Sequence, residues 1–483
     1  MQNMSTYTPT IGLEIHAELQ TATKMFCACR NDADEKRPNY NICPVCMAHP
    51  GTLPVINRDA VHKVLLMGKA LGATLADYTE FDRKNYFYPD IPKNYQLSQY
   101  AYPLVSGGAL RGVAITRIHL EEDTARSQHV TATGEKADAS LVDYNRAGVP
   151  LMELVTEPVI HDAQTAGAFA RELQLLLRTL GAGEANMEKG EMRVEANISV
   201  SKDATLGTKV EVKNLNSFRS VERAIAFEVA RQIELLEQGG TVVQETRGWD
   251  ENKQSTFSQR KKESSHDYRY FPDPDLPKLV LSEIPEFAAE RLLSELPELP
   301  WVRRERYLAL GLKADDADMF VQQRQFGDFF DAVRATSKHN LTELTANYIV
   351  SDIAGKVESG EVPVEWLQVA ANAARFDVLM GMVQKGLLSS RGAKDTLALM
   401  FTDPRDPEHI AKEKGLIQQS DTGALAALVQ KVVDANPSVA ADYRAGKEAA
   451  LQFLVGQGMK ESKGSANPTI LREQFIAVLT ATA

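Results

Sequence analysis

Hydrophobic and polar residues alternate along several short segments in the first part of the chain. In residues 11–19 the apolar side chains stand at odd positions, and Glu14, His16 and Glu18 share the other face. Residues 192–198 repeat this alternation. Because side chains on a strand point alternately to its two faces, both segments are predicted to be half-buried strands.

A helical period follows a further predicted strand at residues 210–213. Ser217 is a suitable N-cap residue, and the apolar residues after it recur at helical spacing as far as Gly239 and Gly240. Strands mixed with helices in this way predict an α+β fold with a largely antiparallel sheet.

Proline density divides the chain. Six prolines stand in residues 271–300, and beyond them the pattern is helical. A second break at residues 402–407 precedes another helical segment, which is rich in alanine and leucine. We therefore expect an α+β domain at residues 1–292, an all-helical domain at 293–404 and a small helical tail domain at 405–483.

The composition of the 483 residues is that of a globular protein: 25% are charged, 43% are hydrophobic, and 65 acidic against 54 basic side chains give a net charge of −11. Such a chain is not a polycation that coats nucleic acid, although it leaves room for a local basic patch. The N-terminal residues lack the features of a secretory signal, and no segment has the roughly 18 apolar residues of a spanning helix. We expect a soluble, cytoplasmic protein without membrane contact.

The four cysteines of the chain fall within one short stretch, as Cys27, Cys29, Cys43 and Cys46. Two close pairs separated by a loop supply four soft thiolates, which suit tetrahedral zinc. Because closed four-thiolate sites are usually structural, we expect residues 27–46 to form a structural zinc-binding insert. The alternatives are buried free thiols or two labile disulfides, which a cytosolic setting disfavours.

Carboxylates also stand on predicted strands. Glu14 and His16 share one strand face, so both could reach a single metal ion or phosphate. Glu122 and Glu153 each alternate with apolar residues, where an unpaired carboxylate is expensive to bury. A divalent metal shared by these four residues and Glu195 would satisfy them, and hard oxygen ligands favour Mg²⁺ or Mn²⁺. The alternatives are a solvated strand face and ion pairs with arginine.

Two segments, residues 82–90 and 267–273, interleave positive charge with aromatic rings. Lysine and arginine can neutralise phosphates while rings stack on unpaired bases or on an adenine. The same composition is common in packed loops. The sequence contains no Walker-type phosphate loop, so any nucleotide site must use a different architecture.

The same segments carry a resemblance to a known family. They closely resemble the GatB family, the B subunits of the aspartyl/glutamyl-tRNA amidotransferases, at residues 11–16, 81–90, 115–123, 150–153, 213–217 and 267–272. The likeness runs nearly end to end and includes Gly456, Lys460 and residues 463–468. So many long motifs in the same order make chance implausible.

The resemblance implies one member of a heterotrimeric ligase that corrects misacylated Glu-tRNA(Gln) or Asp-tRNA(Asn). An amidase subunit releases ammonia from glutamine, and a small third subunit holds the other two together. The GatB subunit uses ATP and Mg²⁺ to activate the side-chain carboxylate of the tRNA-bound amino acid, which ammonia then attacks. The N-terminal domain would be a catalytic cradle similar in fold to glutamine synthetase.

Residue by residue, the family's metal-binding and kinase pocket matches Glu14, His16, Glu122 and Glu153 of this sequence. Lys84 matches a lysine that lines the same pocket. Glu195, a further candidate Mg²⁺ ligand, stands where many members have aspartate. The resemblance also implies that the helical domain and the tail grip the tRNA elbow, with Lys460 and Lys463 as candidate contacts.

Two other hypotheses stay open at this point. One is a zinc-stapled tRNA-binding scaffold without chemistry of its own, which needs the tail and the basic segments but not the carboxylates. The other is a free-standing metallohydrolase, which would act without tRNA or a partner, although no Ser-His-Asp or Cys-His nucleophile set is evident. The leading hypothesis is the ATP-dependent amidotransferase subunit.

Overall fold

The computed structural model describes residues 7–32, 34–130, 136–261, 268–337, 339, 341–418, 422–462 and 466–481. The chain forms two compact units, residues 1–300 and 301–483. Every described strand lies in the first unit, and the second is helical.

The strands of the first unit are β1 (Thr8–Glu18), β2 (Thr74–Leu75), β3 (Tyr78–Thr79), β4 (Asp82–Asn85), β5 (Tyr95–Ser98), β6 (Val105–Ser106), β7 (Ala109–Leu110), β8 (Val113–Glu122), β9 (Arg126–Val130), β10 (Lys136–Asp143), β11 (Pro150–Thr156), β12 (Met192–Ser201), β13 (Val210–Leu215), β14 (Glu245–Asp250), β15 (Ser255–Lys261), β16 (Phe271–Pro272) and β17 (Leu279–Val280). Its helices are α1 (Arg58–Ala70), α2 (Ala163–Thr179), α3 (Phe218–Glu237), η2 (Leu281–Glu283), η3 (Pro285–Phe287) and α4 (Ala289–Glu295).

One 13-stranded sheet dominates this unit, with the main order β15-β14-β13-β12-β1-β11-β8-β5-β4-β16. Among the described strand pairs only β13 and β14 run parallel, so the sheet is largely antiparallel. The expected α+β class is confirmed. The strands predicted at residues 11–19, 192–198 and 210–213 are β1, β12 and β13.

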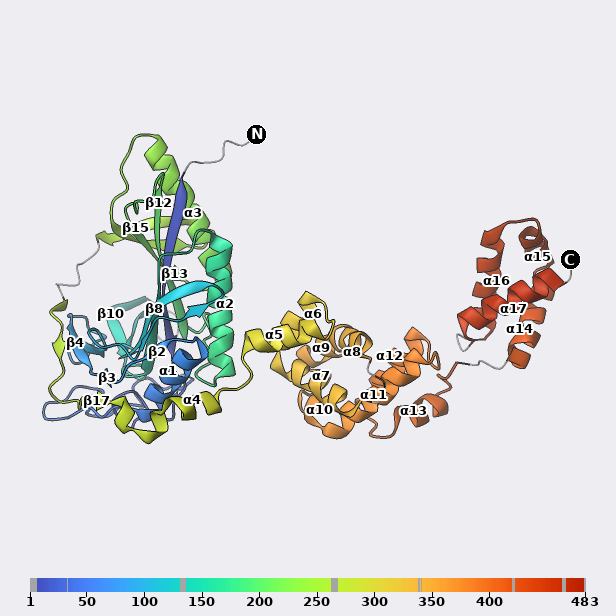
Figure 1. Cartoon of the computed structure of the whole chain (residues 1–483), viewed down its shortest axis with the longest axis horizontal. Helices are drawn as coiled ribbons and strands as arrows, with labels where there is room; N and C mark the ends of the chain where they lie inside the picture. Colours follow the sequence, from blue (N-terminus) through green and yellow to red (C-terminus); the bar gives the residue numbers. More distant parts are fainter. Residues whose placement is uncertain are drawn as a thin grey trace. The chain divides into compact units, whose positions relative to one another are not determined.

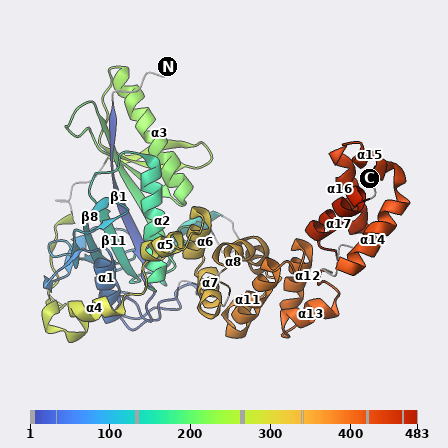
Figure 2. The same ribbon diagram turned by 45° about the vertical axis from the view of Figure 1, so that its right-hand side comes forward.

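The two faces of the sheet differ because β1 alternates as predicted. Ile11, Leu13, Ile15 and Ala17 are fully buried. Helix α3 packs against β12 and β13, and α1 packs against β8. Figures 1 and 2 show α2 and α3 along one side of the sheet. The N-cap of α3 is Ser217 as expected, since its hydroxyl accepts from the backbone amide three residues on. The helices cover the apolar face, and the charged side chains occupy the other.

The helices of the second unit are α5 (Pro300–Ala309, which begins at the boundary), α6 (Ala314–Gln322), α7 (Arg324–Thr336), α8 (Thr342–Tyr348), the π-helix η4 (Ile349–Ile353), α9 (Ala354–Glu358), α10 (Glu365–Gln368), α11 (Ala370–Gln384), α12 (Ser390–Met400), α13 (Pro407–Glu413), α14 (Thr422–Ala435), α15 (Pro437–Arg444), α16 (Glu448–Glu461) and α17 (Pro468–Ala481). Helix α13 packs on α11 and α12, whereas α14–α17 share a core of their own that includes Val429, Leu454 and Phe475. The domain boundaries at residues 292 and 404 stay predictions. None of the described helices is long and apolar enough to cross a membrane.

We expect Ile15→Ala to destabilise the first unit strongly, because Ile15 lies on the central strand β1 and is fully buried. Truncation of such a residue costs about 2–5 kcal/mol in the free energy of unfolding. Urea unfolding followed by circular dichroism measures the loss. Val243→Ala is the matched control, since Val243 is 57% exposed and its truncation is expected to change stability by less than about 0.5 kcal/mol. Equal losses in the two variants would contradict the two-faced sheet.

Candidate functional site

The polar face of the sheet brings together charged side chains from adjacent strands. In the register of β1 with β11, His16 stands beside Glu153. In the register of β11 with β8, Glu153 stands beside His119. On the other side of β1, Glu14 stands beside Glu195 of β12. Neighbouring side chains on one face of a sheet are close enough to interact, so these groups form one continuous polar surface.

His16 lies at the centre of a carboxylate cluster. Its Nε2 is 3.4 Å from Glu153 Oε2, 3.5 Å from Glu121 Oε1 and 4.0 Å from Glu14 Oε1. His119 Nε2 is 3.6 Å from the same Glu153 oxygen. Two sets have ligand atoms close enough together to hold a metal ion, Glu14–His16–Glu153 and His119–Glu121–Glu153. Glu153 belongs to both sets.

Burial and the charges of neighbouring groups shift the pKa values of Glu14 and His16 in this cluster. Burial raises the pKa of Glu14 to about 7, and the charges of Glu153 and Glu195 add to the rise. Burial by itself would lower the pKa of His16, but the hydrogen bond to Glu153 and the charges of Glu121 and Glu153 raise it to about 9. At neutral pH and without a bound metal ion, His16 therefore carries a proton, and its positive charge partly neutralises the carboxylates.

A cavity of about 410 Å³ opens over the cluster, and this volume falls in the range of small-molecule sites. Its charged lining consists of Glu14, Glu153, Glu211, Lys84, Arg117, Lys209 and Lys213. Burial opposes the charged form of Lys84, yet the charge of Glu121 raises the pKa of its ammonium, so Lys84 stays protonated. The cavity therefore presents carboxylates and cations together.

The structure does not bring Glu122 into this cluster. Its two carboxylate oxygens lie 2.5 and 2.6 Å from Lys93 Nζ, and one accepts from the backbone amide of Leu97 at 3.0 Å. Consecutive side chains on β8 point to opposite faces of the sheet. Glu121, and not Glu122, therefore lies on the polar face beside His16. Glu122 therefore lies apart from Glu14, His16 and Glu153 in this structure, and its role as a Mg²⁺ ligand stays a prediction.

The other predicted residues lie in several places. Glu195 contacts Lys213 Nζ at 2.7 Å, and its carboxylate shares a third possible metal set with Glu14 and Glu211. Lys460 is exposed near the end of α16. Lys463 lies outside the described residues.

Sequence reasoning missed Glu121 and His119. The signal was present, because Arg117, His119 and Glu121 alternate along one strand and place three polar side chains on one face. Glu122 was predicted instead because it alternates with apolar residues, but its carboxylate pairs with Lys93, which offsets the cost of burying it. A buried carboxylate that looks unpaired in the sequence can thus have a cation partner from a distant segment.

The four cysteines come together as predicted. Their sulfur atoms all lie within 4.8 Å of one another, and those of Cys29 and Cys46 are 4.0 Å apart. None of the four forms a disulfide. Thiolates around a tetrahedral zinc ion are about 3.8 Å apart, given Zn–S bonds of about 2.3 Å. The cluster is therefore suited to a metal ion of this kind.

Lys24 is a buried cation beside the cysteine cluster. It is 1% exposed, and its Nζ lies 3.9 Å from Cys46 Sγ and donates to the carbonyl oxygen of Tyr144 at 3.1 Å. A hydrogen bond from Cys27 and the charge of Lys24 lower the pKa of Cys46 to about 5, against the effect of burial. A buried ammonium requires negative charge nearby, and the thiolate of Cys46 supplies it.

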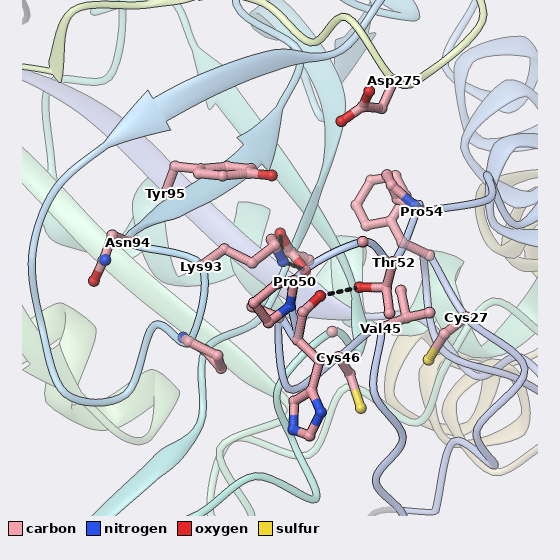
Figure 3. A pocket seen from close by; sticks show the side chains of 17 residues that line it. Cys27, Val45, Cys46, Pro50, Thr52, Pro54, Lys93, Asn94, Tyr95 and Asp275 are labelled. Carbon is pink, nitrogen blue, oxygen red and sulfur yellow. Dashed lines mark hydrogen bonds and ion pairs between the residues drawn. The ribbon is translucent and has the colours of Figure 1, made fainter.

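A second cavity, of about 350 Å³, lies between the cysteine cluster and the Glu122–Lys93 ion pair. Figure 3 shows Cys27 and Cys46 toward one end of it and Tyr95 and Asp275 toward the other. The cavity with the Glu14 and Glu153 carboxylates is lined by a different set of residues.

Comparison with known families decides the identity of the fold. Residues 9–285 match the model described as the GatB/GatE catalytic domain, and residues 328–479 match the one described as the GatB domain. The chain belongs to the GatB family. The resemblance inferred from the sequence is thus confirmed.

Curated relatives of this family cover nearly the whole chain. Each is named as the B subunit of an aspartyl/glutamyl-tRNA(Asn/Gln) amidotransferase. The relative from Thermomicrobium roseum is 45% identical over 473 residues, 96% of each chain. Those from Thermus thermophilus and Carboxydothermus hydrogenoformans are 43% and 42% identical, covering 98% and 97% of this chain and 99% and 98% of their own.

We expect Lys24→Met to weaken metal retention by the cysteine cluster. Four thiolates on a divalent ion leave a net negative charge, which the buried ammonium offsets, and loss of such outer contacts typically costs about 10–100-fold in affinity. Competition between the purified protein and a zinc-binding dye measures the change. Lys36→Met, an exposed position in the same insert, is the control and should leave retention unchanged. Equal retention in both variants would contradict the role of Lys24.

Proposed function

We propose that this chain activates the side-chain carboxylate of Glu-tRNA(Gln) or Asp-tRNA(Asn) with ATP and joins it to ammonia. The observation that carries the proposal is that Glu153 lies between His16 and His119 at a cavity that also contains Lys84. Membership of the GatB family supports the same activity. In this proposal the chain works in the cytoplasm as part of a heterotrimer, with an amidase subunit that supplies ammonia and a small third subunit.

The residues present fit a divalent cation. Glu121 is 2% exposed, and its Oε2 has no hydrogen-bond partner among the described residues. A buried carboxylate oxygen without a partner is costly, and a hard cation removes that cost. Held by Glu14, His16, Glu121 and Glu153, Mg²⁺ would offset the repulsion between the substrate carboxylate and the phosphates of ATP.

The cationic side chains of the cavity suit the same reaction. The substrate carboxylate attacks the γ-phosphorus of ATP, ADP leaves, and ammonia then displaces phosphate from the acyl carbon with loss of a proton. Lys84 keeps its charge and is placed to neutralise the transferred phosphoryl group. Arg117 contacts Glu153 at 3.3 Å while its side chain remains 36% exposed, so it can also bind an incoming anion.

The remaining parts of the chain receive supporting roles in this proposal. Residues 1–292 form the catalytic cradle, and the four cysteines hold a structural zinc ion. Residues 293–404 and 405–483 bind tRNA, with exposed Lys460 as one contact. A scaffold without chemistry is not favoured, because it gives no reason to gather buried carboxylates and two imidazoles at one cavity.

We expect Glu153→Gln to abolish amidation while tRNA binding survives. The substitution removes a charge common to the two possible metal sets that contain a histidine. Metal-assisted catalysis is worth several kcal/mol, so the rate should fall by about 100-fold or more. The heterotrimer is supplied with Glu-tRNA(Gln), ATP, Mg²⁺ and free ammonia, and Gln-tRNA is measured. Exposed Glu188→Gln is the matched control. Normal product formation by Glu153→Gln would refute the proposed activation step.

The same assay distinguishes two adjacent carboxylates. Glu121 faces His16, whereas Glu122 pairs with Lys93, so Glu121→Gln should reduce ammonia-dependent amidation by a larger factor than Glu122→Gln. Circular dichroism establishes that both variants are folded. The reverse order would show that the site is assembled around Glu122.

We expect the affinity for Mn²⁺, used as a spectroscopic probe, to rise with pH. A metal ion binds neutral imidazole, so it must displace the proton that His16 holds up to a pKa of about 9. The affinity should rise by up to about tenfold per pH unit, and more steeply below about pH 7, where Glu14 is also protonated. Titration by electron paramagnetic resonance measures this slope. In His16→Asn the part of the slope that the His16 proton causes up to about pH 9 should be lost; an unchanged slope would exclude His16 as a ligand.

A further inference from the structure

The two segments that interleave positive charge with aromatic rings lie side by side. Strand β16 pairs with β4 in antiparallel register, which sets Phe271 opposite Arg83. Lys84, the next residue of β4, has its Nζ 5.1 Å from the ring centre of Tyr268. Segments far apart in the chain therefore build one surface.

The backbone holds this aromatic segment in a defined conformation. Arg269 has a φ of 46°, a left-handed conformation that is strained for a residue with a side chain. The side-chain amide of Asn85 donates to the carbonyl oxygens of Tyr268 and Arg269, at 3.2 and 2.9 Å. These bonds connect β4 to the turn between Tyr268 and Tyr270, and both rings line the cavity.

Tyr270 makes a parallel stack with Tyr100. The ring centres are 4.1 Å apart and the planes meet at 10°. Tyr268 meets Tyr270 edge-on, with centres 6.0 Å apart. Tyr100 remains 52% exposed, so a further flat ring has access to the pair. All three tyrosines line the same cavity as Lys84 and Glu153.

We propose that Tyr100 and Tyr270 form a stacking platform for the adenine ring of an adenosine. A base on this platform would direct its ribose and phosphates or ester toward Lys84 and the carboxylates. Aromatic rings bind bases through stacking, and a nearby cation binds the attached phosphate. The inference rests on the proposed function, whose reaction involves two adenosines, that of ATP and the 3′-terminal adenosine of tRNA.

The test uses the chain in its heterotrimer, and ATP binding is measured by calorimetry. Tyr100→Ala and Tyr270→Ala should weaken binding of ATP about 5- to 100-fold if ATP occupies the platform. Tyr270→Phe keeps the ring and should retain affinity. Tyr102→Ala is the matched control, because Tyr102 is similarly exposed at 47% but does not line the cavity.

A second arm tests the tRNA terminus. Binding is compared for tRNA with and without its 3′-terminal adenosine. If that adenosine uses the platform, its removal weakens binding to the wild type but not to Tyr100→Ala. A selective loss in either arm supports the platform and identifies its occupant. Unchanged binding of both ATP and tRNA by both alanine variants would overturn it.

These outcomes are separable from failure of the proposed amidation. If Glu153→Gln retained amidation but Tyr100→Ala bound adenosine weakly, the result would support the stacking platform and refute the proposed activation step. If Glu153→Gln lost amidation while the tyrosine variants bound ATP and tRNA normally, the result would support the activation step and refute the stacking platform. Binding is measured without turnover, so neither result depends on the other.

Discussion

The contact between His16 and Glu153 is the interaction on which the candidate site depends. It joins β1 to β11 at the middle of the sheet, on the face that the helices leave uncovered. Glu153 also contacts His119 and Arg117 of β8, so a single buried carboxylate connects charged and polar groups of both neighbouring strands. Without that negative charge, the protonated imidazole would lack its nearest counter-ion, and burial of a lone charge is expensive.

The excess of carboxylates over their partners gives the polar face its chemical character. Burial and repulsion together raise the pKa of Glu14, while Glu121 keeps a buried oxygen without a hydrogen-bond partner among the described residues. A site arranged this way is less stable than an apolar one but is ready to accept a cation or a proton. Such unfavourable burial is common at functional sites, where rigid strands maintain the geometry and the ligand relieves the cost.

Strand β8 separates two environments with two adjacent glutamates. Glu121 belongs to the carboxylate cluster, and Glu122 to the cavity beside the cysteines, where Lys93 neutralises it. The cysteine cluster likewise has its own buried cation, Lys24. Glu122 and the cysteine cluster thus each have a lysine from another segment of the first unit beside them. The positive charge of the lysine lowers the electrostatic cost of burying the negative groups.

The sequence by itself determined the α+β class, the two-faced character of β1, the gathering of the cysteines and the family. These properties depend on local periodicity, short spacing or motif order, all of which are visible along the chain. The tertiary structure alone decided that Glu121 and His119 join the cluster while Glu122 pairs with Lys93, and that Tyr100 stacks on Tyr270. Those outcomes follow from strand register and from partners far apart in sequence, because each strand offers two faces and only its neighbours determine what each face meets.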